Sequence, residues 1–494
     1  MSNSEHSFAD EETALLSDGL GQKRQRTPLP KLQLSVLLFL QFCDPMTCIS
    51  IYPYINELIT GLDITGGDKA KVGYYAGLIE SLYSIAEAAT VLQWGRISDR
   101  IGRKPVLLVG LFGAALSMLF FGLSRSFMTL VISRCLCGIL NGNIGEQNSS
   151  IGTTPTPATE IIIGVMKSAM GELLDPTNRA EGLALLPIIW SVGATIAPVV
   201  GGGLARPHDR FPKYFTSDFW KEYPYFLSCL GAASFIIVSF LTGLFFFEET
   251  SPRHRKLSYS TSSSATVTPT DKCDRPLPLR ELLTYPVVLS VLNYVTLAFI
   301  EIMFIALLPL FMAMPIELGG LGFTPMVIGY VLGAAGAYTA IFQLLFFARL
   351  IRRFGERKLF AAGMLTFCIN SIMFPLTSII ARRTGVTWTV SCLLALSLSL
   401  YPIKDMCYSC IFIYITASSP NKNSLGTTNG ISQTTVSIAR AIGPALATSL
   451  FSFSVDKNIL DGYAVYAILF VLSCLALLPA LRLPAKPWDD YDEQ

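Results

Sequence analysis

Long apolar segments recur along this 494-residue chain and restrict what it can fold into. Hydrophobic residues make up 51% of the sequence and charged residues 15%, whereas a soluble domain carries about 25% charged residues. A helix that crosses a membrane needs about 20 mainly apolar residues. Such segments lie near residues 32–55, 72–94, 105–124, 127–145, 182–203, 223–247, 284–312, 326–348, 358–380, 387–416, 427–450 and 462–481. The chain is therefore predicted to be an all-α membrane protein with twelve transmembrane helices.

Polar stretches divide these segments into two groups of six. We expect a disordered N-terminus at 1–30 without a cleaved signal peptide, a six-helix bundle at 31–247, a linker at 248–283, a second six-helix bundle at 284–482 and a tail at 483–494. Most of the 37 Lys and Arg residues lie in segments that are predicted to face the same side of the membrane as the N-terminus. Because basic residues favour the cytoplasmic side, both termini and the linker are predicted to be cytoplasmic.

Residues 146–164, "EQNSSIGTTPTPATEIIIG", interrupt the fourth segment with a polar run that contains Pro155 and Pro157. Proline removes helix hydrogen bonds, and unsatisfied backbone is not tolerated facing lipid. One interpretation is an insertion that the working protein lacks, such as a retained intron. The other is a cytoplasmic loop after a span that ends near Gly145.

The two groups of segments resemble each other. "GRISDRIGRK" at 95–104 aligns with "ARLIRRFGER" at 348–357, and "FCDPM" at 42–46 aligns with "FIEIM" at 299–303. The second alignment places Asp44 on Glu301. Two six-span repeats predict pseudo-symmetric bundles, with a binding site between them as in alternating-access transporters.

The first of these stretches carries five charges between two apolar segments. Its glycines permit a tight turn, and an acid can face the positive end of a helix. The motif matches the signature between spans two and three of the major facilitator superfamily, through Gly95, Asp99, Arg100, Gly102, Arg103 and Lys104. The resemblance implies a latch that joins the cytoplasmic ends of the two halves in the outward-facing state. For Arg103 and Lys104, an anchor at the membrane surface is the alternative.

A second motif, "SVGATIAPVVGG" at 191–202, resembles the span-five motif of proton antiporters. The matching residues are Gly193, Pro198, Gly201 and Gly202, while Ala197 replaces one glycine. Small residues permit close helix approach, and proline kinks a helix. The resemblance implies a tight hinge that is typical of exporters; ordinary small-residue packing is the alternative.

Further stretches, such as "NRAEGLALLPIIWSVGATIAP" at 178–198 and "NGISQTTVSIARAIGPALATSLFSFS" at 429–454, are similar to the drug:proton antiporter group of this superfamily. Within it they resemble fungal relatives of the zinc-induced-facilitator-like and tetracycline-export transporters. The resemblance implies the major facilitator fold and proton-coupled antiport of a small organic molecule or drug. The His-rich loop of the plant relatives is missing, which argues against direct zinc transport.

Ionisable residues inside the apolar segments are candidates for the coupling site, because a charge at the bilayer centre costs about 2.5–3.5 kcal/mol. The predicted residues are Asp44, Glu80, Glu87, Arg134, Glu301, Lys404 and Arg440. Glu80 and Glu87 are seven residues apart and so share one helical face. Structural pairing is the alternative for Glu80, and a local ion pair with Lys404 is the preferred interpretation of Asp405.

The remaining sequence features limit which functions are expected. The sequence contains no nucleotide loop, His-rich metal site or nucleophile–base pairing, so we expect no enzyme activity, cofactor or nucleic-acid partner. The expected partners are a small-molecule substrate, protons and membrane lipid, and a monomer is expected. A non-transporting nutrient sensor and a proton symporter for a nutrient stay open as alternatives. "DEETALL" at 10–16 resembles an acidic dileucine signal, which leaves vacuolar and plasma membranes as predicted locations.

Overall fold

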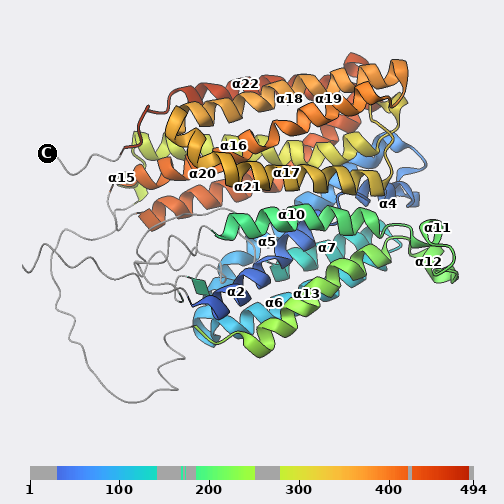
Figure 1. The fold of residues 1–494 in the computed structure, drawn as a ribbon, viewed down its shortest axis with the longest axis horizontal. Helices are drawn as coiled ribbons and strands as arrows, with labels where there is room; N and C mark the ends of the chain where they lie inside the picture. Colours follow the sequence, from blue (N-terminus) through green and yellow to red (C-terminus); the bar gives the residue numbers. More distant parts are fainter. Residues whose placement is uncertain are drawn as a thin grey trace, which may run out of the picture.

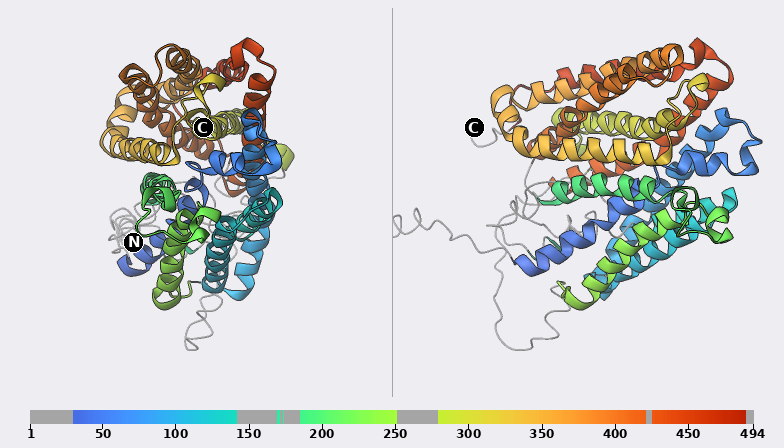
Figure 2. Two further views of the ribbon diagram at one scale, coloured as in Figure 1. Left: turned by 90° about the vertical axis from the view of Figure 1, so that its right-hand side faces the viewer. Right: turned by 45° about the vertical axis from the view of Figure 1, so that its right-hand side comes forward.

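The computed structural model of the chain describes residues 30–141, 169–170, 173, 185–250, 279–420 and 425–488. All regular elements in these ranges are helices. Figure 1 shows them as two layers, one coloured blue to green and the other yellow to red. The two layers stay distinct in both views of Figure 2. These are the two predicted bundles, which we call the N-half and the C-half.

Twelve membrane-crossing segments account for most of the described residues. In the N-half they are α2 (Lys31–Gln41) with α3 (Cys43–Ile49), α5 (Val72–Ile101), α6 (Arg103–Gly122), α7 (Phe127–Asn141), α10 (Leu185–Gly203) and α13 (Phe226–Phe246). In the C-half they are α16 (Tyr285–Ala313), α17 (Pro325–Phe354), α18 (Glu356–Thr384), α19 (Trp388–Ser399) with α20 (Tyr401–Ala417), α21 (Leu425–Asp456) and α22 (Ala464–Leu481). Nine of the described segments are long and apolar enough to cross a membrane, and α7 and α10 are shorter apolar helices. With the more highly charged α5, they give the predicted twelve-helix, two-bundle fold.

Several predicted boundaries need correction. The first span was expected as one helix over 32–55, but α3 ends at Ile49 and the chain turns before α4 (Ile55–Thr60). The motif at 95–104 was expected to form a turn between two spans. Instead α5 continues to Ile101, so Gly95, Asp99 and Arg100 are helical. The turn shrinks to Gly102, since α6 already begins at Arg103.

The turn between α5 and α6 has a counterpart in the C-half. Gly102 has φ 101° and ψ 163°, and Gly355, between α17 and α18, has φ 78° and ψ 164°. This region of backbone conformation is accessible almost only to glycine. The two glycines also occupy equivalent positions in the sequence alignment of the two motifs. The repeat predicted from the sequence therefore extends to the backbone geometry of the turns.

The molecule has two distinct ends. We call the end that carries Gly102 and Gly355 the motif end. The opposite end carries α4, α11 (Pro207–Arg210) and α12 (Asp218–Glu222), and we call it the α11 end (Figure 1). Short helices η1 (Asp63–Thr65), η2 (Lys69–Lys71), α15 (Leu279–Leu282), η3 (Ile316–Leu318) and η5 (Ile459–Gly462) complete the described elements.

Several predictions fall on parts of the chain that the structure does not describe. The expected disordered segment at 1–30, except residue 30, and the centre of the linker lie outside the described residues. The insertion at 146–164 also lies outside them. These domain assignments therefore stay predictions.

Candidate functional site

A central cavity of about 110 Å³ lies between the two halves. It is lined by Asp44, Cys48, Tyr52, Glu80, Tyr83, Ser84, Glu87 and Ala88 of the N-half and by Ile302, Ser437 and Arg440 of the C-half. All three carboxylates in the lining come from the N-half, and the one guanidinium comes from the C-half. Pockets for drug-sized ligands measure about 300–1,000 Å³, so a substrate of that size requires a wider cavity than this conformation offers.

Asp44 sits on α3 and is only 2% exposed. Its Oδ1 accepts a hydrogen bond of 2.9 Å from Asn141 Nδ2 on α7 and one of 3.5 Å from the Cys48 thiol. Asn141 also donates to the Tyr83 hydroxyl, at 2.8 Å, and that hydroxyl lies 3.0 Å from Cys48 Sγ. Residues from α3, α5 and α7 thus fix the carboxylate at the wall of the cavity.

Arg134 lies behind the cavity and is 1% exposed. Its guanidinium donates to the Thr47 carbonyl at 2.9 Å and to Glu80 Oε2 at 3.2 Å, and it stacks 4.1 Å from the centre of the Tyr83 ring. Tyr52 donates to the other oxygen of Glu80 at 3.1 Å. The structural pairing considered for Glu80 is therefore present, although Glu80 also reaches the cavity.

The C-half places a lysine between two carboxylates. Lys404 Nζ on α20 donates to Glu301 Oε1 on α16 at 2.8 Å and also bonds to Asp405 Oδ1. The ammonium group lies 4.7 Å from the centre of the Tyr401 ring. Asp405 was expected to form a local ion pair, and it does so, but it shares Lys404 with Glu301. Of the predicted C-half residues, Arg440 lines the central cavity, whereas Glu301 and Lys404 do not.

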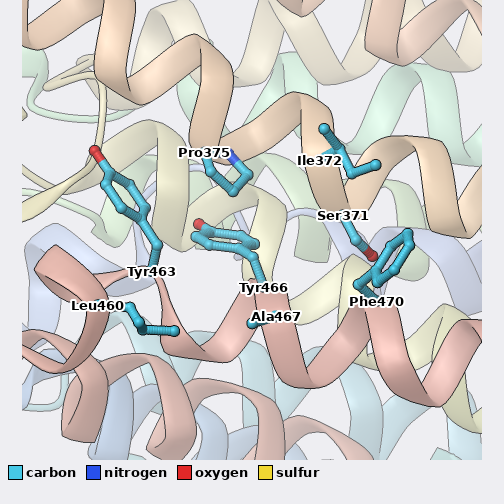
Figure 3. Close-up of a pocket in the computed structure, with 8 residues that line it drawn as sticks. All are labelled: Ser371, Ile372, Pro375, Leu460, Tyr463, Tyr466, Ala467 and Phe470. Atoms are coloured by element: carbon cyan, nitrogen blue, oxygen red, sulfur yellow. The ribbon is translucent and has the colours of Figure 1, made fainter.

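A larger, open pocket of about 290 Å³ lies at the surface of the C-half, where Ile372 and Leu460 are more than half exposed. Figure 3 shows its lining, with Ser371, Ile372 and Pro375 from α18 facing Leu460 of η5, Tyr463 between η5 and α22, and Tyr466, Ala467 and Phe470 of α22. No carboxylate, lysine or arginine is among these residues. The chemistry expected of a coupling site is therefore concentrated in the smaller cavity between the halves.

The glycines of the predicted hinge motif lie where α10 packs closely against two neighbours. A side chain at Gly193 would collide with the Pro45 ring, and one at Gly201 would collide with the Ser50 carbonyl. On the other side, Gly202 faces the Pro325 carbonyl of α17 in the C-half.

The contact between α10 and α17 is reciprocal, because a side chain at Gly329 would collide with the carbonyl of Pro198. Gly333 of α17 likewise faces α10, next to Val199 and the Thr195 carbonyl. The motif thus forms one of the closest helix contacts between the halves.

The predicted latch residues lie at the motif end, apart from the cavity. Glu249, just after α13, accepts hydrogen bonds from the backbone N–H groups of Arg103 (2.8 Å) and Lys104 (3.0 Å). A carboxylate there complements the positive end of α6. Arg103 is buried and Arg100 is exposed, whereas the burial of Gly95 and the side chain of Asp99 lie outside what the structure describes. The contacts described for this motif are within the N-half.

The sequence did not lead us to predict Asn141, Cys48 or Glu249 as site residues. Asp405 was predicted only to form a local ion pair with Lys404. Asn141 gave a usable signal, because it is a polar side chain inside an apolar segment, but only charges were considered. Glu249 gave none, because it lies 146 positions from Arg103 and its role depends on how α13 ends beside α6.

The comparisons with known proteins agree with this architecture. The model of the Major Facilitator Superfamily matches residues 37–145, 158–444 and 312–487. The chain is 30% identical to the major facilitator-type transporter psiT2 of Psilocybe cyanescens, over 96% of both chains. It is 26% identical to the multidrug transporter mfsB of Aspergillus fumigatus, over 89% of this chain and 80% of that one. It is also 26% identical to ZINC INDUCED FACILITATOR-LIKE 1 of Arabidopsis thaliana, over 88% and 87%.

A solved structure shares the fold. The bacterial homologue of the human lysosomal transporter Spinster, in an inward-facing and unoccupied conformation, superimposes with a TM-score of 0.61 at 16% identity, over 94% of this chain and 96% of that one. The family resemblance predicted from the sequence is thus confirmed by the family model, by the relatives and by the fold. The chain is an integral, multi-pass membrane transporter that belongs to the Major Facilitator Superfamily.

Proposed function

We propose that this transporter exchanges protons for a small organic molecule, by alternating access to the cavity between its halves. The observation that supports this most is the cavity wall, where Asp44, Glu80 and Glu87 meet Arg440 from the opposite half. A carboxylate removed from water binds a proton more readily than one in water. Substrate and protons can therefore compete for the same acids.

The packing between the halves supports a pivot near the α11 end, about which the two halves rotate. A side chain at Gly73 or Gly77, in the first turns of α5, would collide with Thr448 of α21, and Ser81 Oγ accepts a 2.9 Å hydrogen bond from the backbone N–H of Ala445. The contact between α10 and α17 lies toward the same end of the molecule, the α11 end. We assign the motif end to the cytoplasm from the distribution of Lys and Arg. Opening at that end then admits substrate from the cytoplasm.

The direction of transport that we propose is out of the cytoplasm. Export across the plasma membrane and loading of a vacuole both move substrate from the cytoplasm into an acidic compartment. At zero membrane potential, a pH difference of one unit corresponds to about 1.4 kcal/mol per proton, enough for about tenfold accumulation in one-for-one exchange.

Purified protein in liposomes tests the proposal, with ethidium and tetracycline as probes and a pH difference of one unit. Antiport predicts accumulation when the liposome interior is acidic, and collapse of the accumulation when a protonophore is added. The matched variants are Asp44→Asn, which removes an acid of the cavity, and Asp461→Asn, which changes an exposed acid of η5.

The same assay separates the alternatives. Accumulation driven by acid outside would indicate a symporter. Binding of a probe without transport under either gradient would favour a sensor. Equal gradient-driven uptake by Asp44→Asn and wild type would show that the cavity acid does not couple protons to transport.

A further inference from the structure

The C-half holds a second group of ionisable residues, consisting of Glu301, Lys404 and Asp405, which we call the lysine triad. One ammonium group contacts both carboxylates, at 2.8 Å from Glu301 and 2.5 Å from Asp405. The contact to Glu301 joins α20 to α16, whereas the contact to Asp405 lies between adjacent residues of α20. The triad lies in the middle portions of both segments.

The charge balance of the triad is uneven. One lysine lies between two carboxylates, so full ionisation would leave one net negative charge within the triad itself, and the further cation Arg440 on α21 acts electrostatically on Glu301. Two carboxylates that share a site do not both ionise readily, and their protons are lost in two coupled steps. An uncompensated buried charge is also costly. The arrangement therefore favours a state in which one of the two carboxyls holds a proton.

Exposure distinguishes the two acids. The side chain of Lys404 is 5% exposed and that of Glu301 is 11% exposed, whereas that of Asp405 is 29% exposed. Asp405 is therefore the less enclosed of the two acids, and we assign the exchange of a proton to it. Lys404 then stays paired with Glu301, and that pair holds α20 against α16 in both protonation states.

Other titratable groups surround the two acids. Tyr401 and Tyr408 lie on α20 itself, and Arg440 approaches from α21. Arg440 is the residue through which this region reaches the central cavity. Arg440 acts electrostatically on Glu301 and also lines the central cavity, so it connects the lysine triad with the cavity.

We propose that Asp405 is a second proton-binding site, separate from the acids of the central cavity, and that Lys404 and Glu301 position it. The proposal rests on the proton coupling proposed above. A proton from water binds a carboxylate oxygen of Asp405 and ends its ion pair with Lys404. Release of the proton to water restores the shared arrangement, and no other bond changes.

Infrared difference spectroscopy of the purified, substrate-free protein tests this inference without any transported probe. Titration with acid should produce a carboxylic acid band that shifts in D2O, and Asp405→Asn should remove the contribution of one carboxyl from it. Lys404→Met should enlarge the band at neutral pH, because neither carboxylate then has its cation. Asp461→Asn, an exposed change of the same chemistry, should remove only a contribution that appears at acid pH, where an exposed carboxylate becomes protonated.

Asp405→Glu is the second variant, for the case that Asp405→Asn does not fold. Because it keeps a carboxyl at this position, it should retain the band at a shifted frequency. An acid titration identical to wild type in folded Asp405→Asn, or an unshifted band in Asp405→Glu, would overturn the proposal. Absence of gradient-driven transport in the wild type would instead contradict the proposed function and leave the infrared result intact. Where wild type exchanges two protons for each ethidium, Asp405→Asn should lower the accumulation ratio about tenfold per pH unit, the equivalent of one proton.

Discussion

Asp44 and Glu301 occupy equivalent positions of the two repeats, but they have different surroundings. Asp44 lies at the wall of the central cavity and accepts a hydrogen bond from the neutral amide of Asn141. Glu301 lies behind that cavity, in an ion pair with Lys404. The two repeats therefore keep an acid at the same position in the fold, but they give it different partners and a different exposure to the cavity. We propose that Asp44, at the cavity, binds a proton in exchange for substrate. Its counterpart Glu301 positions Lys404 instead.

The two turns at the motif end differ in a similar way. In the N-half, the carboxylate of Glu249 accepts from the N–H groups at the start of α6. In the C-half, Arg357 of α18 donates to the Leu481 carbonyl at the end of α22, at 2.6 Å. Each contact complements a helix end, one with a negative and the other with a positive side chain. The backbone repeat thus tolerates a reversal of charge.

The largest predicted effect separates the two equivalent acids. Asp44→Asn should abolish gradient-driven accumulation of substrate, about a tenfold loss per pH unit in one-for-one exchange, because the amide cannot bind the proton. Glu301→Gln should lower accumulation without abolishing it, since Asp405 still compensates Lys404. Liposome uptake measures both, with the exposed change Glu317→Gln as control. Equal losses in the two variants would remove the distinction between the halves.

A second prediction compares the two central arginines. Arg134→Met should lower stability by about 3–5 kcal/mol, because Glu80 loses its buried partner. Arg440→Met should cost much less, since Arg440 is half-buried at the cavity. Thermal unfolding in detergent measures the difference. Partial recovery in the double variant Arg134→Met with Glu80→Gln is expected, and its absence would indicate that the ion pair does not explain the loss.

A third prediction compares the turn glycines. Alanine at either position should cost about 1–3 kcal/mol, because only glycine readily adopts this backbone conformation. Gly102→Ala should cost more than Gly355→Ala, since the added carbon meets the carboxylate of Glu249, whereas nothing lies within 4 Å at Gly355. Unfolding temperatures provide the comparison. A larger loss at Gly355 would contradict the contact of Glu249 with the turn.

The smallest predicted effect concerns the side chains at the two helix ends. Glu249→Gln and Arg357→Gln should each lower stability by up to about 1 kcal/mol, the usual size of a charge–helix-end interaction. Salt should reduce both differences, because these groups are near the surface. Unfolding at low and high ionic strength would measure this. A loss in Glu249→Gln that salt does not change would indicate a steric role instead.

Much of this site could be predicted from the sequence. The cost of burying charge identified Asp44, Glu80 and Glu87, and the repeat alignment related Asp44 to Glu301 and Gly102 to Gly355. Periodicity correctly placed Glu80 and Glu87 on the same face of α5. These inferences depend on position within one segment, which the sequence contains.

Contacts between segments could not be predicted in the same way. The choice of Asn141 as a partner of Asp44 depends on how α7 packs against α3. The double contact of Lys404 depends on the distance between α20 and α16, and sequence adjacency alone suggested Asp405 as its partner. The break after Ile49 was also missed, because the apolar run continues through it.

The central claim is that Asp44 couples protons to substrate, and counterflow of ethidium in liposomes tests it most directly. Counterflow exchanges labelled for unlabelled probe without a gradient, so it requires the binding site and the conformational cycle but no net proton movement. We predict that Asp44→Asn retains counterflow, at a reduced rate because the cavity loses one of its three acids, while gradient-driven accumulation disappears. Retention of pH-driven accumulation by Asp44→Asn, at the wild-type ratio, would contradict the account.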